Sequence, residues 1–295
     1  MHLTEIFYEI DEFCKQFEKQ AEKRFLSDGQ NKRDRAFQLS LSEVMTIMVC
    51  YHESGYKTFK DFYEKHVLIY MKADFHPLVS YNRFLELKQN VLAPLLMFLQ
   101  LNALRPCTGT SYVDSFPLKV CHVKRSYSHK TFKGLAQKGK TSVGWFYGFK
   151  LHVIINHFGE IIAFYITPGN VSDNNKNVLI KLTKKVFGKL FGDRGYLINE
   201  ELFKKLYSSG IHLMTKIRKN MTNKLLSMQD KLLLRKRGVI ESVGSILKES
   251  ESLEHTRHRS LSGFFAHVIA TLVAYNFREN KPSIVDKSRV VGLIG

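Results

Sequence analysis

The first quarter of the chain carries a helical pattern of hydrophobic positions. Between residues 3 and 20, apolar side chains recur three and four positions apart, at Ile6, Phe7, Ile10, Phe13, Cys14 and Phe17. This spacing places them on one face of a helix. Ser40 and Glu43 form a capping-box sequence before the apolar run 44–49, which predicts the start of a second helix at this point.

Single residues further along also predict helix boundaries. Gly55 is expected to end the second helix, because glycine is common just past the last turn. Thr58 and Ser80 each precede apolar residues and are expected to cap two more helices. The pattern therefore predicts an all-helical N-terminal domain over residues 1–104. A helix-turn-helix module for DNA binding and a plain helical bundle both fit this pattern.

The periodicity changes after the turn-rich segment 105–110. Residues 111–123 alternate between apolar and polar side chains, which predicts a strand with Asp114 on the same face as Tyr112 and Phe116. The next elements expected are a hairpin, a helix, a strand, a helix, a strand, a basic linker and an amphipathic helix. Apart from the linker, these elements are expected near residues 144–169, 174–187, 189–193, 199–210, 211–217 and 237–248. This order predicts an α/β domain, a mixed sheet flanked by helices, over residues 105–280, with a C-terminal tail at 281–295.

The helix expected at 237–248 carries a narrow polar stripe. At 100° per residue, Arg237, Glu241, Gly244 and Lys248 fall within about 60° of one another. A solvated surface explains such a stripe, since Arg and Glu four residues apart often pair. Gly244 weakens that explanation, because glycine inside a helix is destabilising by about 1 kcal/mol relative to alanine. We expect it instead to let a nucleic acid approach the backbone closely.

Three carboxylates have the placement that a divalent-cation site requires. Asp114 lies in a strand, Asp193 ends a short strand, and Glu241 lies on the amphipathic helix. Carboxyl ends of strands are where α/β sheets bind ligands, and Mg²⁺ prefers carboxylate oxygens. Two such ions can activate one oxygen and stabilise the leaving oxygen in phosphoryl transfer. We therefore expect these three residues to be catalytic and to bind two Mg²⁺ ions, for which Mn²⁺ can substitute.

Other interpretations of the polar residues stay open. Asp193 also fits the role of a turn residue or a helix cap. Asp173 precedes an expected helix, and we expect it to be the N-cap. The histidines of the sheet region lack the spacing of zinc ligands and are expected to be core or surface side chains, at His122, His152 and His157.

The charge of the chain indicates a polyanionic partner. The sequence has 45 Lys and Arg against 27 Asp and Glu, a formal net charge of +18, which favours nucleic acid or an anionic membrane. Residues 115–159 contain no Asp or Glu, and a second basic run spans 216–237. We expect both runs to contact DNA phosphates. The first run also holds aromatic candidates for stacking on unpaired bases, at Tyr127, Phe132, Trp145, Phe146, Tyr147 and Phe149.

No segment of the sequence predicts a membrane span. The longest apolar runs, 90–104 and 264–277, are short and interrupted by polar residues, so we expect them to be buried core helices. The N-terminal segment is acidic and amphipathic, unlike a signal peptide. Four cysteines without paired spacing suggest reduced thiols. The expected location is the cytoplasm, with no membrane partner.

Three motifs together resemble a known family. "YVDSFPL", "GDRGY" and "RGVIESVGSILK" supply Asp114, Asp193 and the set Arg237, Glu241 and Lys248 in order along the chain. The chain resembles DDE-type bacterial insertion-sequence transposases with an RNase H-like catalytic core, most of all the nine-eight-two insertion-sequence family. The likeness extends to "EHTRHRS" at residues 254–260. One position departs: the related signature has a Tyr three residues before the Arg, where this chain has Leu234.

The resemblance implies a function and its partners. Such a transposase binds the terminal inverted repeats of its element, uses water to free the 3′ ends, and attacks target DNA with those ends. It implies double-stranded DNA as the partner, a homodimer or higher oligomer assembled on DNA, and association with the bacterial nucleoid. DNA contacts are expected from six cations, at Arg237, Lys248, Lys150, Arg194, Arg257 and Arg259.

Two other classes of function stay open. One is a nuclease of the same fold that hydrolyses strands without joining them. The other is a DNA-binding protein derived from a transposase that has no catalytic activity. All three acids are present, which favours an active enzyme. In each case we expect the helical N-terminal domain to recognise the DNA sequence, because phosphate contacts position a protein without specifying bases.

Overall fold

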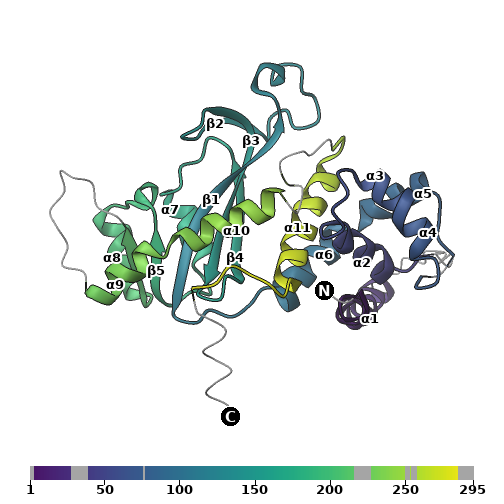
Figure 1. Cartoon of the computed structure of the whole chain (residues 1–295), viewed down its shortest axis with the longest axis horizontal. Helices are drawn as coiled ribbons and strands as arrows, with labels where there is room; N and C mark the ends of the chain where they lie inside the picture. Colours follow the sequence, from purple (N-terminus) through teal and green to yellow (C-terminus); the bar gives the residue numbers. More distant parts are fainter. Residues whose placement is uncertain are drawn as a thin grey trace, which may run out of the picture. The chain divides into compact units, whose positions relative to one another are not determined.

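The computed structural model describes residues 3–27, 39–75, 77–215, 227–249, 253 and 258–284. The chain divides into two compact units (Figure 1). The first unit holds the chain up to Ala103 together with residues 258–279. The second holds the chain from Leu104 to Glu249 together with residues 280–284. The division of function between a DNA-reading domain and a catalytic domain stays a prediction.

Capping side chains begin the helices of the first unit. In chain order, the α-helices are α1 (Leu3–Ser27), α2 (Leu41–Tyr51), α3 (Phe59–Phe62), α4 (Leu68–Tyr70), α5 (Tyr81–Leu87), α6 (Leu92–Phe98) and α11 (Leu261–Phe277). The Ser40 hydroxyl accepts a hydrogen bond from the Glu43 N–H, and the Glu43 carboxylate accepts one from the Ser40 N–H. Thr58 and Ser80 cap α3 and α5 through their hydroxyls. The three predicted helix starts are therefore confirmed.

Helix α11 lies in the core of the first unit. Its residues from Ala266 to Asn276 are all buried, and it packs against α2 and α6. A helix that is apolar all round has to be covered on every side. The prediction that the apolar runs at 90–104 and 264–277 form buried core helices is confirmed for α11, whereas α6 buries only part of its residues, at Pro94, Leu95 and Phe98.

The second unit is built on one mixed sheet. Its strands are β1 (Thr110–Cys121), β2 (Gln137–Lys140), β3 (Trp145–Asn156), β4 (Ile161–Pro168), β5 (Gly188–Gly192) and β6 (Ile211–Thr215). The strand order is β2-β3-β1-β5-β6, and β4 also pairs with β3, along the part of β3 that follows its pairing with β2. β1, β5 and β6 are parallel neighbours, whereas β3 is antiparallel to β1 and to β4. The predicted strand at 111–123 and the hairpin at 144–169 are confirmed.

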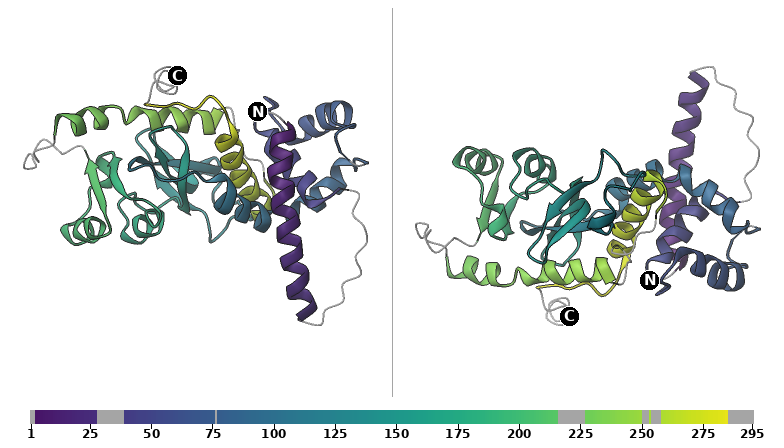
Figure 2. Two further views of the ribbon diagram at one scale, coloured as in Figure 1. Left: turned by 90° about the horizontal axis from the view of Figure 1, so that it is seen from below. Right: turned by 90° about the horizontal axis from the view of Figure 1, so that it is seen from above.

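Helices cover the two faces of this sheet. Helices α7 (Lys176–Leu182) and α8 (Glu200–Ser208) share a buried cluster with Val113 of β1 and Leu190 of β5. Alternate residues of β1 point to the opposite face, where α10 (Gly238–Glu249) contacts the strand. Figure 2 shows α7 and α8 on one side of the sheet and α10 on the other. This arrangement confirms the predicted α/β, RNase H-like fold class.

Two elements of the second unit differ from the sequence-based expectation. β2 pairs with β3 but was not predicted, because its sequence, QKGK, has no hydrophobic alternation. The stretch expected to be a basic linker contains helix α9 (Met228–Arg235), which Ser227 caps by accepting a hydrogen bond from the Asp230 N–H. Local capping therefore forms a helix where charge alone indicated a linker.

Candidate active site

Parallel pairing brings Asp114 and Asp193 to the same point of the sheet. β1 and β5 pair in register from Thr110 with Lys189 to Tyr112 with Phe191. Asp114 and Asp193 each lie two residues beyond that last pair. The two acids therefore lie where the two strands part, at the carboxyl end of β5. The sequence predicted a strand position for each acid, and the register makes them neighbours.

Helix α10 is buried on two sides. Its apolar stripe is buried as predicted, at Val239, Ile240, Val243 and Leu247. The stripe that carries Gly244 faces β1, because a Cβ on Gly244 would lie 2.2 Å from the Phe116 ring. The Lys248 ammonium lies 5.5 Å from the centre of the same ring. The expectation that Gly244 leaves room for DNA is therefore wrong, since this glycine allows the helix to pack on the strand.

Arg237 joins two of the predicted acids. Its guanidinium donates to Asp114 Oδ2 at 3.3 Å and to Glu241 Oε1 at 2.5 Å. Its side chain is 15% exposed, whereas that of Glu241 is 60% exposed. At this position the polar stripe therefore combines a largely buried Arg237 with an exposed Glu241. Arg237 pairs with both carboxylates, and its predicted contact with DNA phosphate stays a prediction.

The carboxyl of Asp114 is held in an environment that favours its neutral form. Burial is the largest cause and raises its pKa from 3.8 to about 6. The Ser115 N–H and Arg237 act in the opposite direction, while the negative charges of Asp193 and Asp173 add to the rise. When a carboxylate lies among other carboxylates, a nearby cation strongly stabilises its ionised form.

Asp193 has two roles in the structure. Its Oδ1 accepts a hydrogen bond from the Gly195 N–H at 2.7 Å, which caps the short 3-10 turn η5 (Arg194–Tyr196). The predicted alternative of a capping residue is therefore confirmed. The cap also fixes the carboxylate close enough to Asp114 to raise the pKa of Asp114.

Asp173 is a fourth acid at this site, and its predicted role was wrong. Asn175, not Asp173, is the N-cap of α7. Asp173 Oδ1 instead accepts hydrogen bonds from the Ser115 hydroxyl at 2.7 Å and from the Lys150 ammonium at 3.1 Å. The signal that could have placed it is topological, because β4 runs parallel to β1 and the loop after β4 leaves the sheet at the same edge.

The remaining predicted DNA contacts differ in accessibility. Lys150 is 12% exposed and paired with Asp173. Arg194 and Arg259 are exposed, and Arg257 lies outside the described residues. Leu234, at the position where the related signature has Tyr, is buried. Lys150 thus pairs with an acid of the site, and its contact with DNA phosphate stays a prediction.

The first basic run is a patterned surface. Its lysines at 119, 124, 130, 133, 138 and 140 are exposed. Among its six aromatic candidates for stacking, Tyr127 and Trp145 are exposed, and each lies near a lysine ammonium, that of Lys138 or Lys140. The other four are buried and belong to the core, at Phe132, Phe146, Tyr147 and Phe149. Base stacking by those four is therefore excluded in this fold. Of the second run, residues 216–226 lie outside the described residues.

The chemistry of the acids fits a hard divalent cation, although they are not arranged as a cage. Within the described ranges, no group of three or more Asp, Glu, His or Cys side chains is placed to hold a metal ion. Arg237 lies between Asp114 and Glu241. Carboxylate oxygens are the donors that Mg²⁺ prefers, so the donor set fits the ion.

The buried histidine of the sheet is not part of such a donor set. His152 is fully buried and its Nε2 lies 3.0 Å from the Thr167 hydroxyl. Burial lowers the pKa of His152 to about 4, so the ring is neutral at pH 7. The prediction that it is a core side chain is confirmed. All four cysteines are free thiols.

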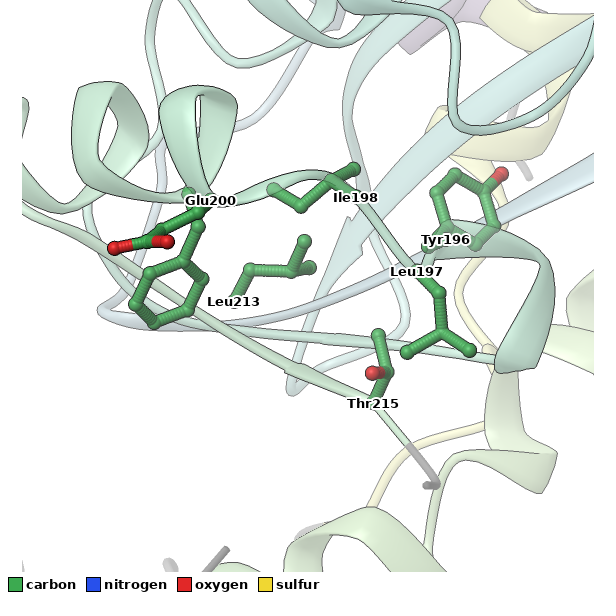
Figure 3. A pocket seen from close by; sticks show the side chains of 7 residues that line it. Tyr196, Leu197, Ile198, Glu200, Leu213 and Thr215 are labelled. Atoms are coloured by element: carbon green, nitrogen blue, oxygen red, sulfur yellow. The ribbon is translucent and has the colours of Figure 1, made fainter. Parts of the chain in front are cut away.

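A small hollow lies beside the acids. Its volume is about 230 Å³, and it is lined by Tyr196, Leu197, Ile198, Glu200, Phe203, Leu213 and Thr215. Figure 3 shows the hydroxyl of Tyr196 directed away from Leu213 and Thr215. None of the predicted catalytic acids lines the hollow, so we do not place the chemistry there.

Comparison with known proteins identifies the family of the chain. A family model described as a transposase DDE domain matches residues 105–261, more than half of the 295 residues. No curated protein sequence matches the chain. In the part of the chain that the structure describes, no helix has the length and apolar character needed to cross a membrane. The matched segment contains Asp114, Asp193 and Glu241, and the chain belongs to the family of transposases with a DDE domain.

Proposed function

We propose that this transposase catalyses metal-dependent cleavage of DNA strands and strand transfer at the terminal inverted repeats of an insertion sequence, one of the nine-eight-two type. The single observation that carries the proposal is the arrangement around Asp114. The β1–β5 register makes Asp193 its neighbour, and Arg237 hydrogen-bonds both Asp114 and Glu241. The family match supports a transposase in general.

The roles of the residues follow from their positions. Two divalent cations, Mg²⁺ or Mn²⁺, would supply activation of the attacking oxygen and stabilisation of the leaving oxygen. Asp114, Asp193 and Glu241 would hold them through carboxylate oxygens. Arg237 pairs with Asp114 and Glu241 in the metal-free protein, and its guanidinium has the geometry to bind a phosphate instead. The exposed lysines of the first basic run would align the DNA backbone.

Removing one ligand at a time tests the proposal. In Asp114→Asn, Asp193→Asn and Glu241→Gln, an amide replaces a charged oxygen with little change of shape, so cleavage of duplexes that flank the gene should fall to background. DNA binding should persist. Glu201→Gln is the matched control, because Glu201 is an exposed acid on α8 paired with Lys176. Near wild-type cleavage by all three site variants would overturn the assignment.

A second assay separates the three classes of function. Pre-cut duplex ends with free 3′-hydroxyls and Mg²⁺ should become joined to a target plasmid. Hydrolysis without joining would favour the nuclease. Binding without either reaction would favour the catalytically silent protein. Size measurement of the complex on DNA tests the proposed dimer or higher oligomer.

A further inference from the structure

Topology places a fourth carboxylate at the edge of the sheet where the catalytic acids lie. β1 and β4 are both antiparallel to β3, so they run parallel to each other. The loop from β4 to α7 therefore leaves at the edge where β5 ends with Asp193. Asp173 lies in that loop, and the Ser115 hydroxyl, next to Asp114, donates to it.

One oxygen of Asp173 is occupied, and the other lies near Gly195. Oδ1 accepts from Ser115 and Lys150. A Cβ on Gly195 would lie 3.5 Å from Asp173 Oδ2 and 2.9 Å from Asp193 Oδ1. Both carboxylates thus border the same face of Gly195, which only a residue without a side chain leaves clear. Gly195 therefore lies beside a carboxylate oxygen of each acid, and its own N–H donates to the Asp193 oxygen.

A buried hydroxyl points to the same place. Tyr196 is 1% exposed, and its hydroxyl makes no hydrogen bond among the described residues. Besides burial, the charges of Asp173, Asp114 and Asp193 raise the pKa of this hydroxyl, in that order, and the Ser115 hydroxyl is close enough to oppose the rise. Tyr196 is thus a buried hydroxyl on which the charges of three acids act. Buried hydroxyls without a partner are rare in folded proteins, so this one indicates a ligand or a ligand's water shell.

The charges at the site leave an excess of negative charge. The site gathers four carboxylates, at Asp114, Asp173, Asp193 and Glu241. Among the described side chains, their ion-pair partners are Arg237 and Lys150. When all four acids are ionised, two negative charges remain, which is the charge that one divalent cation balances. Closely spaced ionised carboxylates repel one another unless a cation balances their charge.

We propose that Asp173 is a further metal ligand, which binds a divalent cation together with Asp193 through the two oxygens that border Gly195. This inference rests on the proposed metal-dependent function. Lys150 holds Asp173 in place in the metal-free protein. The alternative is that Asp173 serves only to fix the loop through Lys150.

Metal titration distinguishes these two roles. Full-length protein is titrated with Mn²⁺ alone, and binding is followed by calorimetry. Asp173→Asn should weaken Mn²⁺ affinity at least about tenfold, the scale on which residues that support a metal site act, while the far-UV circular dichroism stays unchanged. Glu201→Gln is the matched control, an acid also paired with a lysine, and should bind like wild type. Wild-type affinity in a folded Asp173→Asn protein would overturn the proposal.

Lys150→Gln separates a ligand from a loop anchor. If Asp173 only anchors the loop, removing either partner of the ion pair should weaken Mn²⁺ binding equally. If Asp173 is a ligand, Lys150→Gln should retain or strengthen Mn²⁺ binding, because a competing cation is gone. Equal losses in the two variants would therefore reject the proposal.

Asp114→Asn separates this inference from the proposed function. If wild type binds no Mn²⁺, both fail. If Asp114→Asn weakens binding and Asp173→Asn does not, only the role of Asp173 fails. Should Asp173→Asn not fold, Mn²⁺ anomalous scattering from wild-type crystals decides. An ion within about 2.6 Å of an Asp173 oxygen is expected, and ions bound only elsewhere would reject the ligand role.

Discussion

Asp114 illustrates how a single residue links the site to stability. Its pKa is raised from 3.8 to about 6, chiefly by burial. A folded-state pKa above the unfolded value means that the group stabilises the fold fully below about pH 3.8, and that this contribution is lost as the pH rises through about 6. The metal-free protein therefore carries a destabilising ionised carboxyl at neutral pH.

Asp114→Asn should remove the destabilisation that the ionised Asp114 carboxyl causes. In metal-free protein the variant should gain stability relative to wild type between pH 4 and pH 7, by up to about 3 kcal/mol. Urea unfolding at a series of pH values measures the difference. A constant difference across that range would show that Asp114 does not ionise in this window. Added Mg²⁺ should reduce the gain, because it favours the ionised carboxylate of wild type.

Gly244 gives a second prediction at this scale. A Cβ there would lie 2.2 Å from the Phe116 ring, so Gly244→Ala should destabilise the protein by about 1–3 kcal/mol through overpacking. Helix propensity alone predicts the reverse, a gain of about 1 kcal/mol. Ser245→Ala, at an exposed position of the same helix, is the control. Chemical denaturation of both variants decides, and a more stable Gly244→Ala protein would contradict close packing.

Residue-level prediction from the sequence succeeded where chemistry was local and failed where contact was distant. The capping roles of Ser40, Thr58 and Ser80 depend on neighbours within three positions. The role of Gly244 depends on Phe116, which is far away in sequence. Asp173 was assigned to a cap because a nearby helix start was visible and the partners on β1 and β3 were not.

At the scale of elements, β2 and β3 present one exposed part of the first basic run. Trp145 is 63% exposed at the start of β3, and the Lys140 ammonium lies 5.8 Å from the centre of its ring. An exposed aromatic ring beside a lysine can stack on a base while the cation contacts phosphate. The charge pattern predicted this surface, but only the pairing of β2 with β3 brings Lys140 opposite Trp145.

Trp145→Ala should weaken binding to DNA with an unpaired end about tenfold, because one stacked base is worth about 1–3 kcal/mol. Binding to fully paired duplex should change little. Tyr207→Ala on α8, which also removes an exposed aromatic ring, is the control. Fluorescence anisotropy with the two DNA forms measures both effects. An equal loss on both forms would indicate that Trp145 has no preference for unpaired bases.

Strand order was predictable in part. The hydrophobic pattern identified β1 by its alternation of apolar and polar residues, and the β3–β4 hairpin by two apolar runs that flank a turn. It could not identify β2, whose sequence is polar, nor the parallel register of β1 with β5. That register, rather than the existence of either strand, is what makes Asp114 and Asp193 neighbours.

At the scale of the whole molecule, the net charge of +18 predicts strong dependence of DNA affinity on salt. Lys138→Gln combined with Lys140→Gln should lower the slope of log affinity against log salt by about 0.9 for each phosphate that the protein no longer neutralises. Preference for one DNA sequence over another should stay the same, because phosphate contacts carry no base information. Titrations at several salt concentrations measure the slope, and an unchanged slope would remove these lysines from the DNA track.

The place of α11 in the first unit has a consequence for synthesis on the ribosome. The helix that packs against α2 and α6 begins only at Leu261, whereas the helices it covers end by Phe98. The helical unit therefore cannot complete its core while the intervening residues are being made. A chain whose translation stops before Leu261 is released with that core open, so a shortened product of this gene should be a substrate for proteases rather than a DNA-binding competitor of the complete protein.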